Sequence, residues 1–390
     1  MVCREMKALV LGGAGAMAQV TIRDLLENSR VDKVGIADLH VEQAQLAART
    51  LRDDRAIPLT ADARDRRALT RIMRDWDVVV NCTWYELNLL VMEAAIKAGI
   101  HYLDLGGLYH MTRKQLEMDE AAKDADVCCV LGIGSSPGIM NVIGAYAAGK
   151  FEKVETMKLR SASKSALGDT TGFQVPFSIR TILDEFTIPP IILRDGQIRE
   201  VETHSHKERF PMPDPVREAE GYYTIHSELA TMPTMVGKGI KNMDFIVSYS
   251  PEFTRTMLLL VELRLAGKKP LKIRGQEVSP YEFLASVIDG LPRSTVPDLN
   301  VDIQRVEALG VINGMPATVT VDAISRPNEK WNIGGGKMGT GTPASIIAQW
   351  LTSGIMKARG ALPPESCIEP TSFFRELERR GMSIIETVRN

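Results

Sequence analysis

The sequence has few cysteines, no long apolar run and no excess of charge of either sign. Its 390 residues include 5 cysteines, and the formal net charge is −2. An odd number of scattered cysteines predicts reduced thiols in a cytoplasmic protein rather than a disulfide framework. The balanced charge gives no electrostatic reason to expect binding to nucleic acid or to an anionic membrane. No apolar run approaches the roughly 18 residues of a membrane span, and the opening MVCREMK lacks the apolar segment of a signal peptide.

A chain of this length predicts two domains, because single cores rarely grow beyond roughly 250–300 residues. Between residues 7 and 149, short apolar runs alternate with amphipathic stretches of helical periodicity. The runs that we interpret as strands are 7–12, 33–38, 56–62, 77–82, 100–105 and 127–133. Strands that are apolar throughout and separated by helices indicate a doubly wound parallel sheet of the Rossmann type. Cys128 and Cys129 fall in the last strand, where we expect core packing rather than a redox or metal role.

After residue 150 the pattern becomes one of alternating strands, which predicts an α+β domain with a mostly antiparallel sheet. The expected strands are 153–163, 196–204, 221–226, 244–250 and 301–325, and helical stretches lie near 178–186 and 253–266. From residue 343 to 390 the chain is expected to be helical and to pack back on the first domain. The preceding GGGKMGTGTP (334–343) lacks the spacing of a phosphate loop, so we expect a flexible entry into this helix.

A dinucleotide-binding turn is predicted by LVLGGAGAMA, in which Gly13, Gly15 and Ala18 have the spacing G-x-G-x-x-A. The pattern follows the first strand directly and opens a helix, which is the context that makes it informative. Gly13 permits the tight turn, Gly15 lets a pyrophosphate approach the backbone, and Ala18 lets the helix lie close to the sheet. The first helical residues, Ala16 and Met17, are expected to offer backbone N–H groups to the phosphates. The alternative is a tight turn without a ligand.

The second strand ends in Asp38, whose carboxylate can accept hydrogen bonds from the ribose hydroxyls and would repel a 2′-phosphate. We therefore expect NAD rather than NADP. Two later loops also follow strands, at the edge where such sheets bind ligands. Their candidate cofactor-binding residues are Asn81, Cys82 and Thr83 after the fourth strand and Gly134, Ser135 and Ser136 after the sixth. Each loop could instead have a purely structural role.

An ordered set of segments resembles the saccharopine dehydrogenase superfamily, which includes the lysine 6-dehydrogenases. The segments are LVLGGAGAMA, DVVVNC, HYLDLGG, GIGSSPGIMN, PFSIRTILDEF with ILRDGQIREV, IHSELATMP and GALPPESCIEP. The resemblance implies a Rossmann domain at 7–149 and an α+β domain at 150–342 for substrate binding and dimerisation. It also implies a nicotinamide cofactor, a small amino-acid substrate, chemistry at a C–N bond, and a homodimer or tetramer.

Three residues are candidates for acid/base catalysis, which amine oxidation and imine reduction both need. Asp104 ends the fifth strand and could orient a cationic amine, with Gly106 and Gly107 admitting the substrate; the alternative is a carboxylate that binds loop amides. His226 resembles a histidine at the matching place in lysine 6-dehydrogenases, but a structural role is the alternative. Tyr85 is a weaker candidate that could simply pack on the nicotinamide.

Arg180 lies beside the apolar stripe of the helix predicted near 178–186. It resembles an arginine of the saccharopine dehydrogenases that holds the substrate carboxylate. In this it departs from the pattern of the lysine 6-dehydrogenases, whose comparable segment has an acidic residue at this position. A guanidinium suits a carboxylate and would repel an ammonium group. The alternative is an i, i+4 ion pair with Asp184. Ser178 is grouped with Arg180 as a substrate-binding residue.

The leading hypothesis is therefore an NAD(P)-dependent oxidoreductase for a secondary amine or imine that carries a carboxylate. Oxidative deamination of lysine or a related diamino acid is the alternative activity. A non-catalytic NAD-binding sensor or scaffold is the alternative of another class. No metal site is expected, because His204 and His206 lack further ligands nearby and more plausibly lie on a solvated face.

Overall fold

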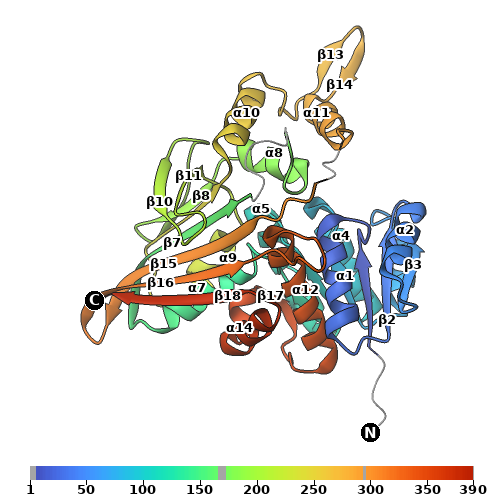
Figure 1. Ribbon diagram of the computed structural model, residues 1–390, viewed down its shortest axis with the longest axis horizontal. Coiled ribbons are helices and arrows are strands. Elements are labelled where there is room, and N and C mark those ends of the chain that lie inside the picture. The colour runs from blue at the N-terminus through green and yellow to red at the C-terminus, as the bar shows by residue number, and fades with distance from the viewer. Residues whose placement is uncertain (1–5, 166–172, 293–295, 390) are drawn as a thin grey trace.

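The computed structural model describes residues 6–165, 173–292 and 296–389, which form two large sheets with helices packed on them and one two-stranded hairpin (Figure 1). The first sheet has the strand order β17-β6-β5-β4-β1-β2-β3, and all its neighbours are parallel. Its strands are β1 (Lys7–Leu11), β2 (Lys33–Asp38), β3 (Ala56–Thr60), β4 (Val78–Asn81), β5 (His101–Asp104), β6 (Cys128–Val130) and β17 (Gly360–Leu362). The predicted Rossmann-type sheet is confirmed, with β17 as an additional strand from the C-terminal region. Cys3 lies outside the described residues.

Helices cover both faces of this sheet, as its uniformly apolar strands require. They are α1 (Ala16–Asn28), α2 (Val41–Leu51), α3 (Arg66–Met73), α4 (Asn88–Ala98), α5 (Tyr109–Leu116), α6 (Asp119–Asp124) and, from the C-terminal region, α12 (Gly335–Ser353). Helix α7 (Ile139–Gly149) packs against the second sheet instead. A short 3₁₀ helix, η1 (Tyr85–Leu87), precedes α4. Cys128 and Cys129 are both fully buried in β6, which confirms their place in the core.

The second sheet has nine strands and is mixed rather than purely antiparallel. Its main path is β10-β11-β12-β7-β15-β16-β18, and β8 and β9 extend it from β12. The strands are β7 (Lys153–Lys164), β8 (Ile191–Arg194), β9 (Gln197–Glu200), β10 (Lys207–Pro211), β11 (Glu218–Tyr223), β12 (Asn242–Ser248), β15 (Val301–Ile312), β16 (Met315–Ser325) and β18 (Ser383–Arg389). The long hairpin β15–β16 turns at Asn313 and Gly314, which have φ of 51° and 75°, as a two-residue Asn-Gly turn requires.

Helices α8 (Ile179–Thr187), α10 (Pro251–Glu262) and α11 (Pro280–Asp289) project from the second sheet together with a two-stranded hairpin (Figure 1). The hairpin consists of β13 (Leu271–Ile273) and β14 (Gln276–Val278). We call these five elements the cap. The predicted apolar stripe of α8 is buried in the core of the cap, where Ile182 and Leu183 pack with Phe253 and Tyr281. Helix α9 (Glu228–Met235) lies between the cap segments in sequence but packs against α7 and β12.

The C-terminal region returns to the first domain through α12 (Gly335–Ser353), which packs along α1. The expected flexible entry at 334–343 is wrong, because most of it is the first two turns of α12. A Cβ atom on Gly341 would lie 2.5 Å from Cβ of Val20 and 2.7 Å from the Met17 carbonyl oxygen. The hydroxyl of Thr21 donates to the Gly341 carbonyl over 2.9 Å. The glycines therefore allow close packing of two helices.

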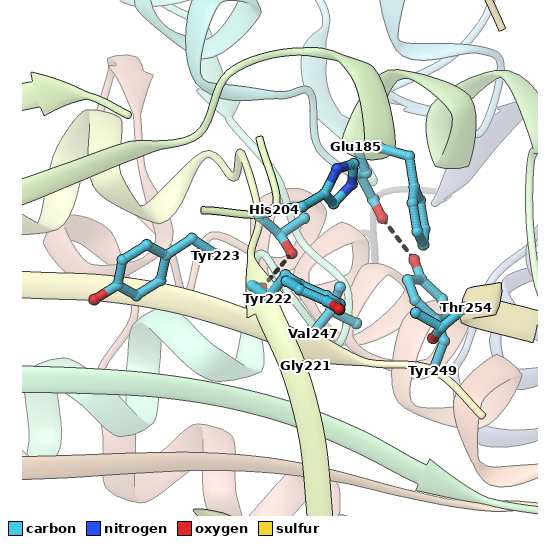
Figure 2. A pocket seen from close by; sticks show the side chains of 10 residues that line it. Glu185, His204, Gly221, Tyr222, Tyr223, Val247, Tyr249 and Thr254 are labelled. Atoms are coloured by element: carbon cyan, nitrogen blue, oxygen red, sulfur yellow. Dashed lines mark hydrogen bonds between the residues drawn. The ribbon is translucent and has the colours of Figure 1, made fainter. Parts of the chain in front are cut away.

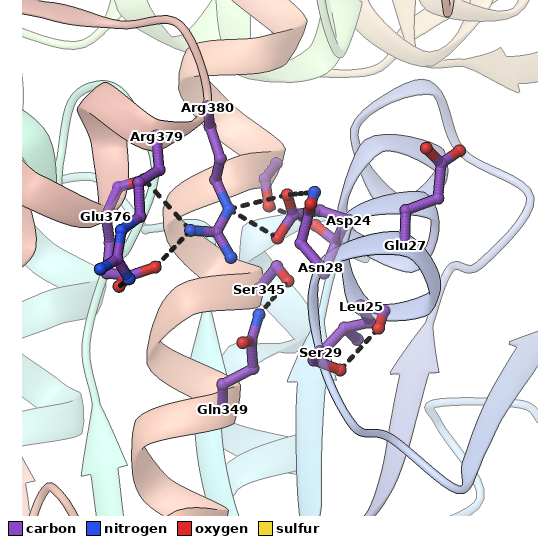
Figure 3. A network of polar contacts seen from close by, with 12 residues as sticks. Asp24, Leu25, Glu27, Asn28, Ser29, Ser345, Gln349, Glu376, Arg379 and Arg380 are labelled. Carbon is purple, nitrogen blue, oxygen red and sulfur yellow. Dashed lines mark hydrogen bonds and ion pairs between the residues drawn. The ribbon is translucent and has the colours of Figure 1, made fainter.

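The last elements, α13 (Pro364–Cys367), α14 (Pro370–Arg379) and β18, tie both sheets together. Arg380, just after α14, donates through Nε to both carboxylate oxygens of Asp24 on α1, over 2.8 and 3.0 Å (Figure 3). Its Nη1 atom also donates to Glu376 over 2.6 Å. Both the Arg380 and Asp24 side chains are buried, so this is a buried ion pair that connects α1 to the C-terminal region. Within the described ranges, no helix has the length and hydropathy of a membrane span.

Candidate active site

The turn between β1 and α1 has the close backbone packing that its glycine pattern predicts. Gly12 has a φ of 68°, in the left-handed region. The Gly13 N–H donates to the Ala37 carbonyl over 3.0 Å, and a Cβ on Gly13 would lie 2.7 Å from the Ile36 side chain. Gly15 is the N-cap of α1, and no side chain caps the helix. The start of α1 is thus held tightly against β2 and its end is left uncapped.

The N-terminus of α1 fits the pyrophosphate of a nicotinamide dinucleotide. The backbone N–H groups of Ala16 and Met17 have no acceptor within the helix, and they lie at the positive end of its dipole. Asp38 accepts hydrogen bonds from the Ala14 N–H over 3.1 Å and from the His40 N–H over 3.2 Å. Each carboxylate oxygen can accept a further bond, so Asp38 fixes the turn and can still bind ribose hydroxyls.

The loop after β4 lies against this turn, at the point where the strand order reverses and such sheets bind ligands. The Cys82 carbonyl oxygen is 3.0 Å from the position of a Cβ on Gly12. Asn81 donates to Asn88 over 2.9 Å and accepts from the Thr83 hydroxyl over 2.7 Å. These side-chain bonds shape the loop, and burial raises the pKa of the Cys82 thiol.

Gly134, Ser135 and Ser136 form the loop between β6 and α7, and both serines bind carboxylates of the second domain. The Ser135 hydroxyl donates to Asp302 on β15 over 2.7 Å. The Ser136 hydroxyl donates to Glu228, at the start of α9, over 2.6 Å. This loop therefore connects the carboxyl edge of the parallel sheet to the second domain.

His226 belongs to that connection, since its Nδ1 atom is paired with the other oxygen of Glu228. Its ring stacks on Phe245 with a centroid distance of 4.0 Å and an interplanar angle of 9°. Burial acts to lower the pKa of His226, but the Glu228 carboxylate outweighs it and the pKa lies above its ordinary value. Glu228 itself is fully buried. The stack and the ion pair fix the ring, leaving Nε2 as the nitrogen available for proton transfer.

A pocket lined by a buried carboxylate and several aromatic rings lies near His226, whose charge acts on that carboxylate. Figure 2 shows the side chains that line it. Glu185 on α8 accepts a hydrogen bond from the Tyr249 hydroxyl over 2.6 Å. Burial raises the pKa of Glu185 to about 7, while the charge of His226 opposes the increase. His204 is half-buried in the pocket wall, so its expected place on a solvated face is wrong. The residues that line the pocket are Glu185, Phe186, His204, Gly221, Tyr222, Tyr223, Thr224, Val247, Tyr249 and Thr254.

Tyr85 links the Rossmann sheet to the cap. Its hydroxyl donates to Asp184 on α8 over 2.6 Å. Asp184 is fully buried and also pairs with Lys268 over 2.8 Å. Burial and the bond to Asp184 raise the pKa of Tyr85, which makes the phenol a poor proton donor. The geometry favours a structural link between the domains.

Asp104 is fully buried and its carboxylate is saturated with hydrogen bonds. It accepts from the Tyr102 hydroxyl over 2.8 Å, from Gln115 over 2.7 Å, and from the backbone N–H groups of Gly106 and Gly132 over 2.8 Å each. Burial nevertheless raises the pKa of Asp104. These bonds match the alternative interpretation of Asp104, a carboxylate that binds loop amides. Neither carboxylate oxygen is left for a substrate.

The three other predicted substrate-binding positions next to these residues have local packing roles. Gly106 has a φ of 109°, and a Cβ there would lie 2.5 Å from Cγ of Pro137. A Cβ on Gly107 would lie 2.8 Å from a side chain of α5. Ser178 is the N-cap of α8, and its hydroxyl accepts from the Thr181 N–H over 3.5 Å. These contacts explain the residue types without a ligand.

Arg180 pairs with carboxylates of α11 rather than with Asp184. It donates to Glu282 over 2.8 Å and to Asp289 over 2.9 Å, both on α11. Its guanidinium lies 6.0 Å from the ring centroid of Trp84. The alternative interpretation, an ion pair with Asp184, is wrong, because Asp184 binds Tyr85 and Lys268 instead. A carboxylate clamp stays a prediction, and a substrate would have to displace two carboxylates of α11.

Two family models together match nearly the whole chain. The saccharopine dehydrogenase NADP binding domain matches residues 8–130, and the saccharopine dehydrogenase C-terminal domain matches residues 134–382. The chain belongs to the saccharopine dehydrogenase family. The cofactor that this membership supports is a nicotinamide dinucleotide, which the uncapped α1 turn fits.

Relatives in this family are only distantly similar in sequence. Carboxynorspermidine synthase of Vibrio cholerae is 23% identical over 250 residues, which cover 60% of this chain and 59% of that protein. Carboxyaminopropylagmatine dehydrogenase of Synechocystis sp. is 21% identical over 294 residues, covering 73% and 72%. The solved structure of saccharopine dehydrogenase (L-Glu forming) from Saccharomyces cerevisiae has a TM-score of 0.77 at 16% identity. It covers 99% of this chain and 100% of that chain, which shows a shared fold.

Sequence reasoning missed the acidic residues that organise this family member's site. Glu228 follows His226 by two positions, and a paired acid near the histidine of IHSELATMP is the signal that was available. Asp184 and Glu185 lie in α8 beside its apolar stripe, and both are buried. Their partners, Tyr85 and Tyr249, are distant in sequence. Among the residues that the structure describes, no cluster of His, Cys, Asp or Glu could hold a metal ion.

Proposed function

We propose that this chain is an NAD(P)-dependent oxidoreductase acting on the C–N bond of a secondary amine or imine that carries a carboxylate. The observation that carries the proposal is the pair His226–Glu228, which is joined through Ser136 to the carboxyl edge of the cofactor-binding sheet. The pair puts a proton-transfer group beside the edge where parallel sheets bind nucleotide ligands. Two relatives are named for carboxylated amines, which supports the substrate class.

The chemistry divides between cofactor and protein. When bound, the nicotinamide supplies or takes up the hydride. In imine reduction, protonated His226 gives the proton at Nε2 to the substrate nitrogen. In amine oxidation, the neutral ring takes that proton back. Because Glu228 raises the pKa of His226, the ring keeps its proton to a higher pH than an ordinary histidine, which suits the reductive direction.

We further propose NAD as the preferred cofactor, although the matched family model is described as NADP binding. Asp38 ends β2, and its carboxylate would repel a 2′-phosphate while accepting bonds from a free ribose. The expected outcome is tighter binding of NADH than of NADPH, measured by nucleotide fluorescence. Replacing Asp38 with Ser should reduce the difference in affinity between NADH and NADPH. Equal affinities in the unchanged protein would refute this preference.

The acid/base role is tested with His226→Gln, which keeps a polar side chain of similar size. Loss of general acid catalysis should lower kcat by about 10²–10⁴-fold and remove the pH dependence of kcat between pH 6 and 9. Candidate substrates are saccharopine and carboxylated polyamines, with lysine offered separately to test oxidative deamination. The control His206→Gln replaces a ring that stacks on Tyr223 and is 44% exposed. An unchanged kcat in His226→Gln would refute the role, and turnover of lysine alone would replace the substrate class.

A homodimer is proposed on the exposed apolar surface of the cap. Leu259 on α10 and Leu263, the residue just after it, are 53% and 59% exposed, and Phe283 on α11 is 60% exposed. The hairpin β13–β14 belongs to no larger sheet, and isolated two-stranded hairpins are marginally stable. Light scattering should give the mass of a dimer, and Phe283→Glu should shift it toward the monomer. A monomeric unchanged protein would refute the proposal.

A further inference from the structure

The pocket beside His226 is walled by a continuous chain of rings. The Tyr222 and His204 rings meet edge to face with centroids 5.5 Å apart. The His204 ring lies 5.8 Å from Phe186, and the Phe186 ring lies 5.8 Å from Tyr249. All four residues line the same pocket, and Figure 2 shows His204, Tyr222 and Tyr249 around its interior. Faces of aromatic rings carry negative potential and attract organic cations.

The carboxylate of Glu185 closes one side of this ring of aromatic side chains. Glu185 is 9% exposed and lines the pocket, and its Oε2 atom accepts from the Tyr249 hydroxyl. None of the described residues that line the pocket is Lys or Arg. The charge of His226, which acts on Glu185 from outside the pocket lining, offsets only part of the cost of burying an ionised carboxylate, because the pKa of Glu185 is still raised. A cationic ligand in the pocket would offset more of that cost.

We propose that this pocket binds an alkylammonium group, the charged end of an amine-bearing substrate. Its use for the substrate rests on the proposed function, whereas binding of an alkylammonium in the pocket does not. The cavity of about 20 Å³ is the size of an ammonium head group, so the alkyl chain would extend toward its open side. The four rings line the wall beside the ammonium, and Glu185 balances its charge. A neutral apolar ligand would leave Glu185 with the Tyr249 hydroxyl as its hydrogen-bond partner but would add no charge to balance the carboxylate.

Binding should depend on pH in a way that identifies Glu185. Burial raises the pKa of Glu185 to about 7, and the groups that face it are His226, Asp184, Glu228 and the Tyr249 hydroxyl. An alkylammonium stays charged in this range, with a pKa near that of lysine, about 10.4. If only the ionised carboxylate binds, affinity should rise about tenfold from pH 6 to pH 8.

The experiment is calorimetric titration of the full chain with n-butylammonium, and with n-butanol as the uncharged probe. We expect binding of n-butylammonium only. At pH 8, Glu185→Gln should weaken it about tenfold or more, because a charge-assisted contact is lost. The same change should reduce the pH dependence of binding to the part that comes from the charge of His226. Tyr222→Leu, at a partly exposed position, should weaken binding by about two- to fivefold through loss of one ring face. The matched control Glu378→Gln changes an exposed acid on α14 and should leave the affinity unchanged.

Several outcomes would overturn the inference. These are no binding to the unchanged protein, equal binding of n-butanol, or an affinity that neither Glu185→Gln nor Tyr222→Leu alters. Should Glu185→Gln fail to fold, Tyr222→Leu and the pH dependence of the unchanged protein decide the matter. The titration measures binding and not turnover. A failure of the proposed role of His226 would therefore not affect the binding result, and a failure of binding would not affect the proposed role of His226.

Discussion

Glu365 on α13 is a carboxylate whose protonation should affect the stability of the folded protein. Its Oε2 atom accepts from Asn141 on α7 over 2.8 Å. Its Oε1 atom is buried and has no hydrogen-bond partner among the described residues. Burial raises the pKa of Glu365 to about 7; hydrogen bonds from Thr231 and Asn141 oppose the increase, and the Glu228 charge adds to it.

The size and sign of the effect follow from the two pKa values. The folded value is about 7 and the ordinary value is 4.5, and at 1.36 kcal/mol for each pH unit the difference is worth about 3 kcal/mol. Because the folded value is the higher one, the contribution to stability is complete below about pH 4.5. It is lost as the pH rises through about 7, where the buried carboxylate ionises.

Glu365→Gln removes this titration, so its stability relative to the unchanged protein should increase with pH. We expect the difference in unfolding free energy to grow by about 2–3 kcal/mol between pH 4.5 and pH 8, measured by urea denaturation. The amide alters hydrogen bonding as well, but that change is the same at every pH. The control Glu117→Gln, at an exposed position after α5, should show no such trend. A difference independent of pH would refute the reasoning.

Two further predictions concern the contacts between α1 and the C-terminal region. Arg380→Ala should lower the unfolding free energy by about 3–5 kcal/mol, because Asp24 would stay buried without its cation; urea denaturation measures this, and the exposed Arg379→Ala should change it by less than about 1 kcal/mol. Gly341→Ala should cost about 1–3 kcal/mol, because its Cβ would meet α1 at 2.5 Å. Gly149→Ala, where a Cβ would meet nothing within 4 Å, is its control. Equal losses for either matched pair would contradict the packing argument.

The first domain could be predicted because its signals are local. Each strand of a covered parallel sheet is apolar along its whole length, so the six runs identify their own strands without knowledge of their partners. The turn at Gly13 and Gly15 is equally local, since strand, glycines and helix are contiguous. By contrast, β17 has three residues and depends on pairing with β6, far away in sequence. Nothing within Gly360–Leu362 alone indicates a strand.

Residues 334–343 show that a glycine-rich segment can form either a flexible loop or a closely packed helix. Glycines near a lysine suggested a flexible loop, because glycine has the largest conformational freedom of any residue. In the structure the same glycines lie in α12, where Gly335 and Gly341 have no room for a side chain. The cost of glycine in a helix is therefore offset by close packing, which depends on α1 and β16. The local sequence does not indicate that α1 and β16 pack against this segment.

The candidate site shows the same division between residue type and environment. Asp104 and Glu185 are both buried acids, yet only tertiary contacts tell them apart. Asp104 accepts four hydrogen bonds within the first domain, so its charge is already satisfied. Glu185 has the Tyr249 hydroxyl and a pocket, so its charge is left for a ligand. An acid at the end of a strand thus predicts where a charge lies, whereas its hydrogen-bond partners decide whether that charge can act on a substrate.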